Sequence, residues 1–111
     1  MQKRTIIDRI EIEPQTGNIA VRMRKQVVDD DGAVLASEYH RAMIEAELAD
    51  PAALLALVDG HLATLGFPAV KAEDRAVLDT ALATFDSLRA EKAQEKRASA
   101  ALEALVEAQP K

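Results

Sequence analysis

The sequence predicts an α+β fold in which an antiparallel β-meander of three strands precedes a short helix and a long helix. Residues 5–44 contain three runs in which apolar and polar side chains alternate, separated by two turn sequences. Residues 51–65 carry apolar side chains at the spacing of one helix face. Residues 71–108 contain neither proline nor glycine and are rich in Ala, Leu, Glu, Lys and Arg, as in a continuous helix.

Length and composition limit the domain organisation and the kinds of partner. A chain of 111 residues suits one domain with a modest core. We expect residues 1–70 to form the meander with a covering helix, and residues 71–111 to form a long helix whose last third extends from the body. The absence of cysteine excludes a disulfide framework, a thiolate metal site and a cysteine nucleophile.

The distribution of charge and aromatic residues argues against nucleic acid as the main partner. The net charge is -5, no segment forms a basic stripe, and only three aromatic residues are present. No segment approaches the roughly 20 apolar residues of a membrane span. We therefore expect a protein that is cytoplasmic when made, with no membrane or nucleic-acid partner.

The first two strands define a register. Ile6, Ile10 and Ile12 alternate with polar residues and are predicted to share one face of the first strand. The turn Pro14-Gln15-Thr16-Gly17 has Pro and Gly at favourable positions. A four-residue loop here pairs Ile12 with Ile19 and Ile10 with Val21, which keeps apolar residues opposite each other.

The second turn, Asp29-Asp30-Asp31-Gly32, allows two registers. A three-residue loop pairs Met23 with Tyr39 and Arg24 with Glu38, whereas a two-residue turn pairs Lys25 with Glu38. We prefer the first register because it keeps the apolar residues of all strands on one face. The buried face is then predicted to contain Ile10, Ile12, Val21, Met23 and Tyr39.

The short helix is predicted to begin at the N-cap Asp50, with Pro51 at the first helical position, and to end at Gly66. Its apolar face should cover the meander through Leu54, Leu57, Val58, His61, Leu62 and Leu65. The first part of the long helix has a second apolar stripe that ends at Leu88, and we expect it to pack on the short helix as a helical hairpin.

The end of the long helix is predicted to contact another chain. Residues 89–97 are mostly charged and polar and interrupt the apolar stripe, so we expect this span to be solvated or to cross a wet interface. Apolar side chains return on another face of the helix, at Ala98, Leu102, Leu105 and Val106. Because this patch has no partner within the chain, we predict that it serves oligomerisation or partner binding.

Candidate sites for chemistry have simpler structural explanations. Residues 27–38 overlay a calcium-loop template, but Val27 stands at the first ligand position and the flanking segments are predicted strands. His61 lies within an apolar helix face, without a second His or Cys at ligand spacing, and is read as a packed or edge histidine. We find no nucleophile with positioned partners and no glycine-rich phosphate loop. We therefore predict a non-enzymatic protein with no catalytic residue, no metal site and no cofactor.

A possible polar recognition patch comprises Arg22, Arg24, His40 and Arg41. Its arginines could bind a phosphate or a carboxylate. The alternative is an ordinary solvated strand face, because the register places Glu11 and Glu38 near enough to neutralise these arginines.

Residues 5–70 resemble small proteins encoded near the tail and fibre genes of tailed bacteriophages. The resemblance rests on the runs Ile-Glu-Pro-Gln-Thr-Gly-Asn, Val-Arg-Met-Arg-Lys-Gln-Val-Val-Asp-Asp-Asp-Gly, Glu-Tyr-His-Arg and His-Leu-Ala-Thr-Leu-Gly-Phe-Pro-Ala-Val. It implies a structural or accessory role in a tail or virion, with the protein itself and other protein subunits as partners. The alternative function is a cytoplasmic adaptor, chaperone or small regulator that binds one protein partner.

Overall fold

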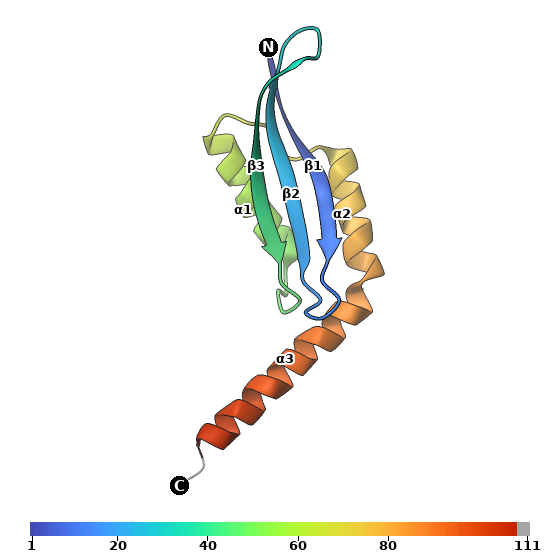
Figure 1. Cartoon of the computed structure of the whole chain (residues 1–111), viewed down its shortest axis with the longest axis vertical. Coiled ribbons are helices and arrows are strands. Elements are labelled where there is room, and N and C mark those ends of the chain that lie inside the picture. The colour runs from blue at the N-terminus through green and yellow to red at the C-terminus, as the bar shows by residue number, and fades with distance from the viewer. Residues whose placement is uncertain (109–111) are drawn as a thin grey trace.

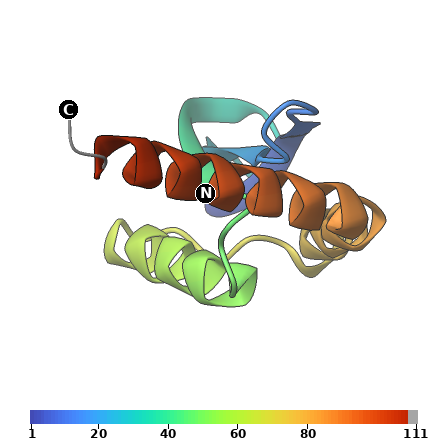
Figure 2. The ribbon, with the colours of Figure 1, turned by 90° about the horizontal axis from the view of Figure 1, so that it is seen from below.

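The computed structural model describes residues 1–108 and confirms an α+β fold with an N-terminal β-meander. Three antiparallel strands are followed by three helices (Figure 1): β1 (Gln2–Ile12), β2 (Ile19–Val28), β3 (Val34–Ile44), α1 (Pro51–Thr64), α2 (Ala72–Thr84) and α3 (Asp86–Glu107). The strands lie in the order β1-β2-β3. Helices α1 and α2 lie on the same side of the sheet, α1 by β3 and α2 by β1 (Figure 2).

The register of the first hairpin is confirmed near its turn and changes farther along β1. Ile12 pairs with Ile19 and Ile10 with Val21, as predicted. A β-bulge at Asp8 then inserts one unpaired residue between Ile7 and Arg9. Because a bulge exchanges the two faces of a strand, Ile7 packs against the core, and the predicted placement of Ile6 on the core face is wrong.

The second hairpin combines features of the two predicted registers. The three-residue loop is present, because the backbone N–H of Asp29 donates to the carbonyl of Ala33. A bulge at Leu35 then shifts the pairing by one residue, so that Lys25 pairs with Glu38 and Met23 with His40. The preferred register is therefore wrong beyond the turn. Tyr39 is 51% exposed on the outer face, not buried on the core face.

The hydrophobic core lies between the sheet and the first two helices. The sheet contributes four buried apolar side chains to this core, those of Ile19, Val21, Met23 and Ile44. Leu55, Val58 and Leu62 of α1 and Leu78 of α2 complete the cluster. Ile10 and Ile12 are half-buried at its border.

Helix α1 begins as predicted but buries a narrower face. The Asp50 carboxylate accepts from the backbone N–H of Ala53 at 3.2 Å, which confirms the N-cap. Leu57 is 73% exposed, Leu65 is 44% exposed and His61 is exposed as well, so the predicted burial of these three residues is wrong. Residues 51–64 contain only one charged residue, Asp59, and the helix therefore presents apolar or small side chains to solvent as well as to the core.

The predicted single helix of residues 71–108 is divided at Phe85 into α2 and α3. The hydroxyl groups of Thr80 and Thr84 each donate to the carbonyl four residues earlier, at 3.0 and 2.8 Å, an arrangement that bends helices. The hairpin prediction also needs correction. Although α1 and α2 run antiparallel (Figure 1), each packs mainly on the sheet, and the ion pair of Asp59 and Arg75, at 4.0 Å, links them.

The molecule is elongated, because α3 continues past the end of the sheet (Figure 1). Its extents are 69 × 28 × 19 Å and its radius of gyration is 18.3 Å. A compact domain of this length would have a radius of gyration of about 13 Å. Within residues 1–108, no helix combines the length and the apolar character needed to cross a membrane.

Candidate functional site

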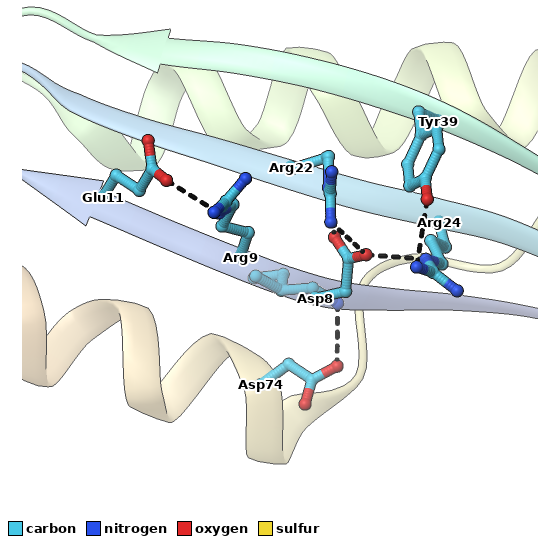
Figure 3. Close-up of polar contacts among 8 residues, drawn as sticks. Asp8, Arg9, Glu11, Arg22, Arg24, Tyr39 and Asp74 are labelled. Atoms are coloured by element: carbon cyan, nitrogen blue, oxygen red, sulfur yellow. Dashed lines mark hydrogen bonds and ion pairs between the residues drawn. The ribbon is translucent and has the colours of Figure 1, made fainter.

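The outer face of the sheet, which no helix covers, carries a cluster of charged residues around the bulge residue Asp8 (Figure 3). The Asp8 carboxylate accepts two hydrogen bonds from Arg22, both at 3.0 Å. It accepts a third from Arg24 at 2.6 Å. The bulge therefore directs one carboxylate toward two arginines of the neighbouring strand.

Tyr39 of β3 completes this cluster. Its hydroxyl accepts a hydrogen bond from Arg24 at 3.0 Å, and the Arg22 guanidinium lies 4.5 Å from its ring centroid. The hydrogen bond from Arg22, aided by Arg24, holds the pKa of Asp8 below its ordinary value although partial burial opposes the shift. The same contact raises the pKa of Arg22. These charges are thus satisfied internally, and the cluster joins all three strands.

Arg41 differs from the other arginines on this face. It lies directly opposite Arg22 in the ladder, and within residues 1–108 its side chain has no hydrogen bond or ion pair. Arg9 lies on the other side of Arg22 and is paired with Glu11 at 2.7 Å (Figure 3). An open hollow of about 370 Å³ is lined by Arg9, Arg22 and Arg41, among others. Arg41 can therefore offer its guanidinium to a carboxylate or phosphate group.

The predicted polar patch is not contiguous, because His40 lies on the opposite face of the sheet from Arg22, Arg24 and Arg41. The His40 ring lies 5.5 Å from that of His61, centroid to centroid, beside α1. Burial lowers the pKa of His40, and the neighbouring His61 and Lys25 lower it further. Arg22, Arg24 and Arg41 do share the outer face, and the structure places Asp8 and Tyr39 beside them.

A second site begins where α3 crosses the turns at the end of the sheet. Arg89 is buried and donates to the carbonyl of Gly17 at 3.2 Å and to that of Glu45 at 2.8 Å. Gly17 has φ +72°, and a Cβ there would lie 3.1 Å from the Arg89 Cα, so glycine permits both the turn and the close approach of α3. Lys96 pairs with Glu47 at 2.9 Å. Of the two alternatives for residues 89–97, solvated or at a wet interface, the structure shows a polar interface with the body.

Beyond this contact, the predicted patch of α3 is exposed. Leu102, Leu105 and Val106 are 62%, 61% and 60% exposed, and Ala98 is exposed as well. Ala98 lies about 180° from Arg89 around the helix axis, at 100° per residue. The patch therefore points away from the side of α3 that the turns hold, and nothing in residues 1–108 covers it.

The role of Arg89 as a buried anchor was not predicted from the sequence, where its charge places it in a span expected to be solvated or at a wet interface. The available signal was the spacing of Phe85, Arg89 and Ala93, which continue one helix face at intervals of four residues. Ala93 is buried on that face next to Arg89.

The acidic loop has a structural explanation. The Asp29 carboxylate accepts from the backbone N–H groups of Asp31 and Ala33, both at 2.9 Å, and so closes its own turn. In the part of the chain that the structure describes, no three His, Cys, Asp or Glu side chains are grouped closely enough to hold a metal ion. No family model, curated protein or solved structure matches this chain.

Proposed function

We propose that this protein is a non-enzymatic assembly protein that associates with copies of itself through the C-terminal part of α3. The exposed patch of Leu102, Leu105 and Val106 carries this proposal. Arg89 and Lys96 fix the direction of α3 relative to the sheet, and the patch lies on the free side of the helix. A second copy offers a surface of the same kind, so a symmetric helix pair would bury both patches.

The energetics favour this arrangement over an isolated helix end. A helical segment of about ten residues without packing is marginal in water, because most helical stability in proteins comes from burying an apolar face. Burial of each of these three side chains contributes roughly 1.5 to 3 kcal/mol before the entropic cost of association. Two copies contribute two such sets against this cost.

The biological setting that we propose is the tail or virion of a bacteriophage, and it rests on the sequence resemblance of residues 5–70. A second candidate is an adaptor that binds one foreign protein partner. The observation that favours it is Arg41, which has no counter-charge within residues 1–108 and lies on the open outer face. An adaptor would be a monomer or dimer until its partner is present.

Size-exclusion chromatography with light scattering tests the proposal on full-length chains. The double variant Leu102→Glu, Leu105→Glu places charges in the patch and should lower the mass of the assembly. The control, Ala100→Glu with Ala104→Glu, adds the same charge to other exposed sides of the same helix segment and should retain the native mass. Equal masses for the native chain and both variants would reject self-association through this patch and favour the adaptor.

A further inference from the structure

The two edges of the sheet differ in how they are protected. At the β1 edge, the backbone N–H of Ile7 donates to the Asp74 carboxylate of α2 at 2.9 Å, next to the bulge at Asp8 (Figure 3). At the β3 edge, within residues 1–108, no hydrogen bond joins a β3 backbone group to any element except β2. Most of the eleven residues of β3 are exposed. An uncovered edge strand of this length is a template for pairing with another strand.

A second exposed feature runs beside the same edge. Leu57 and His61 of α1 and its C-cap Leu65 follow one another at intervals of four residues and form a ridge. The His61 ring lies 5.5 Å from His40 of β3, which places this ridge along the β3 side of the core. On the other flank of α1, Asp59 contacts Arg75 and the backbone of Val70 near α2. The ridge is therefore on the flank that faces away from α2.

These two features belong to one surface, and we propose that a second copy of the chain binds there by pairing its own β3 antiparallel to this β3. The two sheets would become one continuous sheet, with both α1 helices on the same side of it. Each exposed ridge would then have the ridge of the partner's α1 to pack against. This contact is separate from the α3 patch, so the inference goes beyond the function proposed above.

The sequence of β3 favours its own copy as the occupant, because it is self-complementary about Tyr39. Antiparallel pairing centred on Tyr39 places Ser37 opposite Arg41, Glu38 opposite His40, and Ala36 opposite Ala42. Pairing centred on Glu38 or on Arg41 would instead set two like charges directly against each other, which is destabilising. The charge pattern therefore disfavours these two registers, and the register centred on Tyr39 is the one in which Glu38 meets a basic side chain, His40 of the second copy.

Disulfide crosslinking tests this register in a chain that has no cysteine of its own. The double variant Ser37→Cys, Arg41→Cys should form a reducible dimer of twice 12.0 kDa on mild oxidation, because the two positions face each other across the contact. Either single variant should not, since each new thiol then faces a native side chain. An intrachain bridge is excluded, because four residues of strand span about 13 Å.

All three variants also carry Leu102→Glu and Leu105→Glu, which remove the proposed α3 contact. The crosslinking result then depends on the β3 contact alone, and it can fail or succeed independently of the α3 proposal. The proposal would be overturned if the double variant crosslinks no more than either single variant does.

The contribution of α1 is tested in the same crosslinking background. Leu57→Glu with Leu65→Glu should lower the crosslinked fraction several-fold. The matched control, Ala56→Glu with Ala63→Glu, charges two other exposed positions of α1 and should leave the fraction unchanged. An equal effect of both pairs would show that the ridge is not part of the contact and would contradict the proposed arrangement.

Discussion

Asp8 illustrates how one carboxylate stabilises the outer face of the sheet. Its pKa lies below the ordinary value of 3.8, chiefly because Arg22 donates to it. The unfolded chain therefore takes up this proton at a higher pH than the folded chain does. The stability that Asp8 contributes is fully present above pH 3.8 and is lost as the pH falls through the folded pKa.

The replacement Asp8→Asn should lower stability at neutral pH and reduce the loss of stability on acidification. The amide cannot titrate, and it leaves Arg22 and Arg24 without a counter-charge. Urea unfolding of both chains at about pH 7 and about pH 3 measures the two differences. An equal loss of stability on acidification in the variant and the native chain would show that Asp8 does not contribute to it.

Arg89 is the residue that fixes the direction of α3. The replacement Arg89→Ala removes two charge-assisted hydrogen bonds, to the carbonyls of Gly17 and Glu45. Each such bond contributes about 1.5 to 3 kcal/mol to stability. We therefore expect the free energy of unfolding to fall by at least the contribution of one such bond. Arg97→Ala, at an exposed position of the same helix, is the control and should have almost no effect. Chemical denaturation compares the two variants, and equal effects would contradict the anchoring role.

At the scale of the elements, the bulge in β1 decides which isoleucines support the core. Ile7 packs against the core on the other side of the bulge from Ile10, and Ile7→Ala should cost up to about 2 to 5 kcal/mol. Ile6 pairs with Arg24 on the outer face, so Ile6→Ala should cost clearly less. Denaturant unfolding of both variants tests the exchange of faces at Asp8. A greater loss for Ile6→Ala would mean that β1 continues without the bulge.

The elements themselves could be predicted from the sequence, because alternation, turn residues and the N-cap are local signals. The pairing of Ile12 with Ile19 follows from one such turn. The bulges at Asp8 and Leu35 could not be predicted, since nothing in the residue types marks them, and each one exchanges the two faces beyond it. The break at Phe85 likewise occurs without proline or glycine.

Local periodicity also decides which parts of the candidate site could be predicted. The patch at Leu102 and Leu105 is periodic within one helix and is therefore visible in the sequence. The roles of Asp8 and Arg89 depend on partners 16 and 72 residues away, at Arg24 and Gly17. Such contacts become apparent only after the chain has folded.

At the scale of the whole molecule, we propose two separate surfaces for contact with copies of the chain. The α3 patch lies at the far end of an elongated particle, and the β3 edge lies along its body (Figure 1). Two symmetric contacts with different axes give each chain two neighbours, so assembly can continue beyond a dimer. This arrangement suits a structural component better than a protein that holds a single partner.

The central claim of self-assembly is tested most directly by the mass of the native chain in solution. Sedimentation equilibrium over a range of concentrations requires no substitution and no partner. We predict a mass well above that of one 12.0 kDa chain, rising with concentration as the two contacts fill. A mass of 12.0 kDa at every concentration would contradict the account.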